Sequence, residues 1–180
     1  MTFTFAPIET MPDVVVIEST RHGDARGWFI ESYKRSVFAE QGISREFWQD
    51  NHSLSAEAGT LRGLHYQTEP FGQGKLVRVV TGEIFDVAVD IRPRSRTFGR
   101  YISIVLHARD SKMLWIPEGF AHGFQTLIAN TEVSYKTTAE YSAPHERGIR
   151  WDDPALGIQW PIERPILSHR DRGWPVLSTQ

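Results

Sequence analysis

Short hydrophobic runs alternate with turn residues along almost the whole chain. Runs rich in Val, Ile, Phe and Tyr recur between Gly, Pro, Asp and Asn, a pattern typical of β-strands. The sequence predicts ten strands, over residues 14–18, 28–33, 47–52, 61–66, 75–81, 83–90, 101–106, 113–116, 123–127 and 132–137. Ten short strands separated by turns indicate an all-β fold, a sandwich or barrel of the jelly-roll kind.

The stretch 83–90 has the clearest alternation of side chains. Its even positions, including Asp86 and Asp90, alternate with hydrophobic odd positions, so we expect a strand with one buried face. The step Thr81-Gly82 before it is typical of a tight turn. The pattern therefore predicts a hairpin over residues 75–90.

One segment has a helical pattern, and the C-terminal segment has none. Residues 36–41 are expected to form a helix with Ser36 as its N-cap and Gly42 as its end. Residues 154–180 contain four prolines and are expected to be mostly irregular. A length of 180 residues with 40% hydrophobic residues favours a single domain over 1–180.

Composition and charge exclude several functional classes. A net charge of −2 gives no strong field towards nucleic acid or an anionic membrane. The chain has no Cys, which excludes disulfides, thiol catalysis and Cys-ligated metal and fits a reducing compartment. No signal peptide and no hydrophobic run of bilayer length is found, so we expect a cytoplasmic protein that binds neither membranes nor nucleic acid.

The motif LRGLHYQ places a histidine, His65, among hydrophobic residues on a predicted strand. A neutral imidazole, with an unperturbed pKa of about 6.5, can accept a proton near neutral pH. The alternative is a core histidine that hydrogen-bonds the backbone. Regular alternation places Arg62 on the opposite face from His65. Either the strand bulges near Gly63, or Arg62 serves a different surface.

A second histidine, His122, lies in PEGFAHGF, which matches the second half of the metal-binding motif of cupin barrels. Such sites usually take two further histidines from an H-x-H pair and a carboxylate. His65 is followed by Tyr66 and Gln67, so the pair is missing and we expect no metal. His122 is interpreted as a polar wall residue near His65.

Three further side chains can carry chemistry or be ordinary structural residues. Lys75 begins a strand and is either solvated or directed into the barrel, where it would stabilise an oxyanion. Tyr135 and Tyr141 are six residues apart and would share one face of a continuous strand. The basic turn RPRSRTFGR is interpreted as a solvated loop.

Together these segments resemble one family, the dTDP-4-dehydrorhamnose 3,5-epimerases of deoxysugar biosynthesis. The motifs that carry the resemblance are D-x-RG-x-F-x-E (24–31), QDNHS, LRGLHYQ, QGKLVRVVTGEIFDVAVDIR, SRTFG, LWIPEGFAHGF, YKTTAEY, ERGIRWDDP and LSHRD. They cover nearly the whole chain, in order and at the usual spacing. The resemblance implies a homodimeric epimerase without cofactor or metal, on a jelly-roll (cupin-like) barrel, acting on a dTDP-4-keto-6-deoxysugar.

The resemblance also implies roles for individual residues. His65 matches the general base and is paired with Asp171, Lys75 would hold the enolate oxygen, and Tyr135 would protonate the opposite face of the sugar. The implied substrate-binding residues are Arg62 and His122 in the active site, Arg26, Glu31, Gln49 and Asn51 near the nucleotide, Tyr141 against the sugar or nucleotide, and Arg170 in LSHRD.

The implied reaction inverts carbons 3 and 5 of dTDP-4-dehydro-6-deoxy-D-glucose to give dTDP-4-dehydro-L-rhamnose. The ketone at carbon 4 acidifies the hydrogens on both carbons, so a base, an acid and a cation are sufficient. Three alternatives remain open: a single-centre epimerase with the same residues, a metal-dependent cupin enzyme, and a non-catalytic carbohydrate-binding jelly roll. The last would not need His65, Lys75, Tyr135 and Asp171 together.

Overall fold

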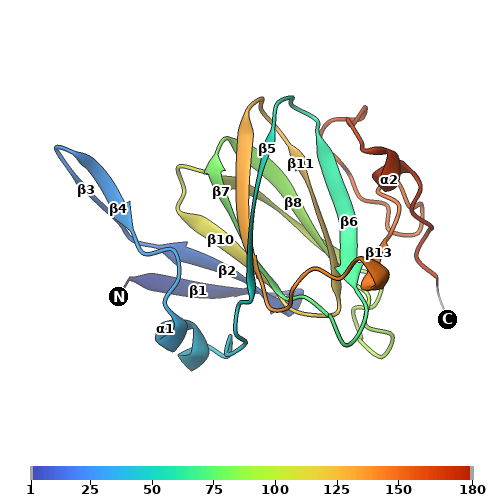
Figure 1. The fold of residues 1–180 in the computed structure, drawn as a ribbon, viewed down its shortest axis with the longest axis horizontal. Coiled ribbons are helices and arrows are strands. Elements are labelled where there is room, and N and C mark those ends of the chain that lie inside the picture. Colours follow the sequence, from blue (N-terminus) through green and yellow to red (C-terminus); the bar gives the residue numbers. More distant parts are fainter. Residues whose placement is uncertain (1, 179–180) are drawn as a thin grey trace.

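Two antiparallel β-sheets face each other in the computed structural model, which describes residues 2–178 (Figure 1). The six-stranded sheet comprises, in spatial order, β1 (Phe3–Ile8), β2 (Met11–Ser19), β10 (Lys112–Ile116), β7 (Lys75–Thr81), β12 (Thr131–Thr137) and β5 (Gln49–Ser55). The five-stranded sheet comprises β13 (Glu146–Gly148), β6 (Leu61–Gln67), β11 (Phe120–Thr126), β8 (Glu83–Asp90) and β9 (Tyr101–His107). The predicted all-β jelly roll is confirmed.

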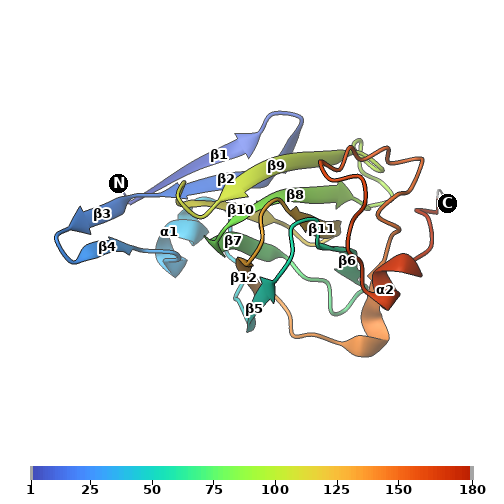
Figure 2. The same ribbon diagram turned by 90° about the horizontal axis from the view of Figure 1, so that it is seen from above.

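The remaining elements lie outside the two sheets. Strands β3 (Arg21–Asp24) and β4 (Gly27–Ile30) form a hairpin that projects away from the barrel (Figures 1 and 2). Helix α1 (Arg35–Glu40) follows it, and the 3-10 turn η1 (Ala143–His145) and helix α2 (His169–Arg172) lie in the C-terminal half. The predicted helix exists, but its N-cap is Lys34, so the assignment of Ser36 as the cap was wrong.

The hairpin predicted for residues 75–90 was wrong. β7 belongs to the six-stranded sheet and β8 to the five-stranded sheet, so the two strands do not pair with each other. Gly82 joins them at φ +89°, and a Cβ there would lie 2.3 Å from Thr131 Oγ1. The turn signal was real, but it marks the crossing from one sheet to the other.

Both faces of β8 are buried, although the sequence predicted only one. The inner face contributes Ile84 and Ala88 to the main core between the sheets. On the outer face Val87 and Val89 pack in a second cluster with Leu156 and other residues of the C-terminal tail. The tail is mostly irregular, as predicted, and covers the outside of the five-stranded sheet (red in Figure 2).

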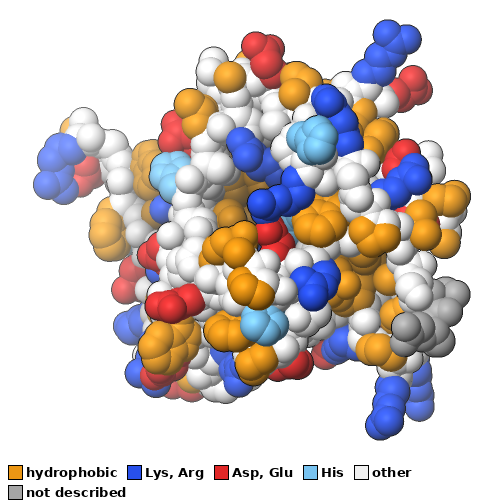
Figure 3. Space-filling model, turned by 45° about the vertical axis from the view of Figure 1, so that its right-hand side comes forward, with side chains coloured by type: hydrophobic (Ala, Val, Ile, Leu, Met, Phe, Trp, Pro, Cys, Tyr) orange, Lys and Arg blue, Asp and Glu red, His pale blue; other side chains and the backbone are white. Residues whose placement is uncertain are grey.

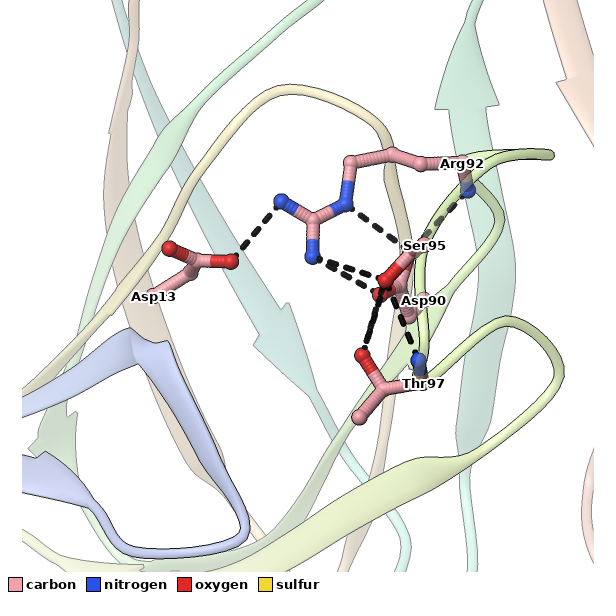
Figure 4. A network of polar contacts seen from close by, with 5 residues as sticks. All are labelled: Asp13, Asp90, Arg92, Ser95 and Thr97. Carbon is pink, nitrogen blue, oxygen red and sulfur yellow. Dashed lines mark hydrogen bonds and ion pairs between the residues drawn. The ribbon is translucent and has the colours of Figure 1, made fainter.

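A network of polar contacts lies where β8 ends at Asp90 (Figure 4). The buried Asp90 carboxylate accepts hydrogen bonds from the Arg92 guanidinium at 2.9 and 2.7 Å and from the hydroxyls of Ser95 and Thr97 at 2.5 and 2.6 Å. The same guanidinium reaches Asp13 of β2 at 2.8 Å. The network therefore ties the β8–β9 loop to the opposite sheet.

Candidate active site

A cavity of about 370 Å³ lies between the sheets, a size typical of small-ligand sites. Eight of the twelve residues predicted for the site line it: Gln49, Asn51, Arg62, His65, Lys75, His122, Tyr135 and Tyr141. Strand register explains the grouping on the six-stranded sheet. Thr137 pairs with both Lys75 and Gln49, and Tyr135 pairs with Asn51, so alternate positions face the same side.

A bulge in β6 brings Arg62 and His65 to the same cavity. His65 pairs with His122, whereas Arg62 pairs with Phe124. β6 therefore has one more residue than β11 between these two pairs. The irregularity lies at Gly63, with φ +137°, where a Cβ would lie 2.5 Å from the Cα of Gly123. Of the two alternatives for Arg62, the strand bulge is the one observed.

His65 and Asp171 are in direct contact although they are 106 residues apart in sequence. His65 Nε2 lies 2.5 Å from Asp171 Oδ1. Ser168 caps helix α2 by accepting from the Asp171 backbone N–H at 3.0 Å, and its hydroxyl donates to Asp171 Oδ2 at 2.8 Å. Burial alone would raise the pKa of Asp171, but the contacts with His65 and Ser168 lower it below its usual value. The ionised carboxylate accepts from Nε2–H, which leaves Nδ1 as the basic nitrogen.

Lys75 is the buried cation of the cavity. Lys75 is only 6% exposed, and its Nζ donates to the backbone oxygen of His65 at 3.1 Å. Burial lowers the pKa of Lys75 to about 8, against the opposing effect of Asp86 and Glu146. The ammonium form therefore still predominates at neutral pH, beside the imidazole.

Tyr135 faces the cavity from the sheet opposite His65. Burial raises the pKa of Tyr135, so the phenol keeps its proton and can act as a donor. The prediction that Tyr141 continues the same strand was wrong, because β12 ends at Thr137. Tyr141 nevertheless reaches the cavity from the following loop, with its hydroxyl donating to Glu146 at 2.8 Å.

The amides of the cavity wall are held by hydrogen bonds. Gln49 donates to Asn51 Oδ1 at 2.8 Å and accepts from the Tyr141 backbone N–H at 2.8 Å. Arg62 is anchored by Ser55 Oγ at 3.2 Å and by a backbone oxygen of Leu54 at 3.3 Å. These side chains are thus fixed where they meet the cavity.

Two acidic residues of the site were missed by the sequence analysis. Asp86, on the inner face of β8, contacts His122 Nε2 at 2.5 Å, and Glu146 lines the cavity. Arg170, predicted to bind substrate, donates to Glu146 at the cavity edge. The sequence pattern did not reveal Asp86, because a carboxylate that alternates with hydrophobic residues along a strand is ordinarily expected on the solvent-facing side.

Two predicted residues lie away from this cavity. Arg26 is on the turn of the β3–β4 hairpin and pairs with Asp24, with both side chains largely exposed. Glu31 follows the same hairpin, and its backbone oxygen accepts from Ser19 at 2.6 Å. Neither residue lines the cavity of its own chain.

No group of three His, Asp or Glu side chains within residues 2–178 is arranged to hold a metal ion. Across the same residues no helix is long and apolar enough to cross a membrane.

The space-filling view shows basic side chains beside hydrophobic ones near the centre of one face (Figure 3). That face offers both cationic and apolar contacts.

Fold and cavity together define a class: a cupin-like jelly roll whose barrel holds an acid–base pair on one wall and a phenol on the other. Residues 9–179 match the family model described as dTDP-4-dehydrorhamnose 3,5-epimerase. A protein of that name from Shigella flexneri is 54% identical over 162 residues, 89% of each chain.

Solved structures give the same result. An epimerase of that name from Bacillus anthracis, with TDP and PPi bound, aligns with a TM-score of 0.94 at 44% identity, covering 97% of this chain and 99% of the other. An enzyme from Legionella pneumophila, in complex with dTDP-4-keto-L-rhamnose, aligns at 0.93 with 42% identity, covering 97% and 93%. This chain belongs to the dTDP-4-dehydrorhamnose 3,5-epimerase family. The predicted family and enzyme class, an isomerase, are confirmed.

Proposed function

We propose that the chain inverts carbons 3 and 5 of dTDP-4-dehydro-6-deoxy-D-glucose to give dTDP-4-dehydro-L-rhamnose, with His65 as the base and Tyr135 as the acid. The observation that carries this assignment is their position on opposite sheets of one cavity. A base and an acid on opposite sides of a sugar ring are what inversion of a carbon requires.

The chemistry follows from the ionisation of each group. His65 Nδ1 takes the proton from carbon 3 or carbon 5, and the electron pair of that C–H bond moves onto the oxygen at carbon 4. Asp171, 2.5 Å from the other ring nitrogen, stabilises the imidazolium. The Lys75 ammonium stabilises the enolate oxygen, and the Tyr135 hydroxyl then protonates the same carbon from the opposite face.

The remaining cavity residues fit a nucleoside diphosphate group. Arg62 and Arg170 carry cations at the cavity wall and edge, as an anionic diphosphate requires. Gln49 and Asn51 offer amide donors and acceptors suited to a base, and Tyr141 offers a ring for stacking. His122 completes the wall beside His65.

The test is incubation with the proposed substrate in heavy water. Deuterium at both carbons, with inverted configuration, supports the assignment, whereas deuterium at one carbon indicates a single-centre epimerase and none refutes the reaction. His65→Asn should remain folded and lose incorporation. A His65→Asn variant with near-normal incorporation would remove His65 from the mechanism.

We further propose a homodimer, in the cytoplasm, in which the β3–β4 hairpin of one chain reaches the cavity of the other. Trp28 and Phe29 on this hairpin are 58% and 65% exposed, unusual for large hydrophobic side chains. Arg26, predicted to bind the nucleotide, lies on the same hairpin.

Subunit mixing tests the arrangement. R26A and H65N, each impaired alone, should regain part of the lost turnover when coexpressed, because a mixed dimer contains one cavity with both residues. Sedimentation of the mixture as a monomer, or no recovery, would contradict the shared site.

A further inference from the structure

Asp86 is a buried carboxylate that the mechanism above does not use. It lies on the inner face of β8 between the core residues Ile84 and Ala88, and it is fully inaccessible to solvent. Its Oδ1 contacts His122 Nε2 at 2.5 Å. Its Oδ2, also buried, has no hydrogen-bond partner among residues 2–178.

A half-satisfied buried carboxylate is costly unless a cation is near enough to compensate its charge. Burial lowers the pKa of His122, against the effect of Asp86 itself, so His122 is a neutral donor and not the compensating charge. Lys75 is buried and lines the same cavity as His122, the residue that Asp86 contacts, and Asp86 stabilises its positive charge.

The other charged and titratable groups of the cavity do not replace Asp86. Glu146 also acts on Lys75, but it accepts hydrogen bonds from Tyr141 and from Arg170, and the Arg170 guanidinium compensates its charge. From β6, His65 is engaged with Asp171, and Arg62 contributes a second positive charge. From β12, Tyr135 keeps its proton and is neutral. Asp86 is thus the carboxylate left to balance the Lys75 ammonium.

We propose that Asp86 is a positioning residue of the reaction, whose buried carboxylate keeps Lys75 protonated and fixes the ring of His122 in the cavity wall. This role rests on the proposed function, because a cation is needed only where negative charge develops on a substrate oxygen. Asp86 itself acts through Lys75 and His122.

The pH dependence follows from the direction of the charge effect. The pKa of Lys75 is about 8, and it would be lower without Asp86, because a nearby carboxylate favours the ammonium form. Activity that needs the ammonium is present below this pKa and is lost as the pH rises through it. Removing the Asp86 charge should therefore move the alkaline limb of kcat to lower pH, by about one pH unit.

The test compares Asp86→Asn with a matched control, Asp90→Asn. Both carboxylates are fully buried on the inner face of β8, but Asp90 pairs with Arg92 at the end of this strand. We expect the alkaline limb to shift in D86N, with about a 5-fold loss of kcat at pH 8, about a 10-fold loss at pH 9 and little change in KM. The limb should not shift in D90N. An unshifted limb in D86N, or an equal shift in both variants, would overturn the role of Asp86.

A second measurement does not depend on turnover. The chain has four lysines, Lys34, Lys75, Lys112 and Lys136, so the ¹³Cε resonances of labelled protein can each be assigned by a Lys→Arg substitution. A pH titration of the free protein then gives the midpoint of the Lys75 ¹³Cε resonance. This midpoint should be lower in D86N than in wild type and unchanged in D90N. If wild-type protein does not turn over the keto-sugar, the proposed function fails, whereas an unmoved Lys75 midpoint refutes only the link to Asp86.

If D86N does not fold, combining it with Lys75→Met distinguishes a packing role of Asp86 from compensation of the Lys75 charge. The double variant removes both members of the compensating pair, so it should fold where D86N does not. Failure of the double variant to recover folding, measured by urea unfolding, would show that Asp86 is needed for packing and not for the charge of Lys75.

Discussion

Asp90→Asn is the substitution whose cost the structure defines best. The Asp90 carboxylate accepts five hydrogen bonds: three from Arg92, including its backbone N–H at 3.0 Å, and one each from Ser95 and Thr97 (Figure 4). An asparagine amide nitrogen would face groups that donate. The two hydroxyls can rotate to accept, but a guanidinium has no acceptor.

The expected loss of stability is about 2–4 kcal/mol. Removal of one member of a buried ion pair typically costs about 3–5 kcal/mol. Part of this is recovered because the Arg92 side chain is 34% exposed and keeps Asp13 at 2.8 Å. Arg92 also stacks over the ring of Phe120 at 4.6 Å, which keeps its guanidinium close to residue 90 in the variant.

The pH dependence of this loss gives an independent check. Burial would raise the pKa of Asp90, but hydrogen bonds from Arg92, Ser95 and Thr97 lower it to about 2 from 3.8. A lowered carboxyl pKa stabilises the fold above the unfolded-state value, and the contribution is lost as the pH falls towards 2. The contribution is roughly 2 kcal/mol at neutral pH and about half of that at pH 3.

The assay is urea unfolding of wild type and D90N at pH 7 and pH 3. The difference in unfolding free energy between the two proteins should shrink by about 1 kcal/mol at the lower pH. Arg92→Lys, which retains the charge but not the fork of donors, should cost less than D90N. Equal differences at both pH values would refute the assignment of the stabilisation to the ionised carboxylate.

Three further predictions concern the cavity. D171N should fold and lose about 1000- to 10,000-fold in kcat, because the amide neither fixes the His65 tautomer nor stabilises the imidazolium; a loss below 10-fold would count against the pair. Y135F should still exchange substrate hydrogen for deuterium but without inversion, since only the acid is removed; inverted product detected by NMR would contradict its role. Gly148→Ala should lower kcat about 10- to 100-fold with folding retained, because its Cβ would lie 2.4 Å from the Trp174 ring, which packs beside His65, and must displace it by about 1 Å. An unchanged kcat in that variant would show that Trp174 does not position the pair.

The strands that the sequence predicted are those with hydrophobic alternation. Strands β1, β3 and β13 were missed, because β1 carries a proline, which weakens a strand pattern, and the other two are short. Which strands pair with each other was harder to predict than where the strands lie. The Thr81-Gly82 turn is equally compatible with a hairpin and with a crossing between sheets. Only the packing of the second sheet decides between the two.

The site was predictable largely through the family resemblance. Residue patterns alone left His65, Lys75 and Tyr135 each open to an ordinary structural reading, since no local pattern reports what lies across a cavity. The contact of His65 with Asp171 joins positions 106 residues apart, which no periodicity encodes. Asp86 and Glu146 were missed because each becomes notable only beside Lys75.

Asp171 sits on the C-terminal tail, whereas His65 sits on the barrel, and this division has a consequence for how the protein loses activity. Opening of the tail alone would separate the pair and leave both sheets intact. Inactivation by mild denaturant can thus precede unfolding of the sheets. The catalytic pair then reports the docking of one segment and not the integrity of the whole molecule.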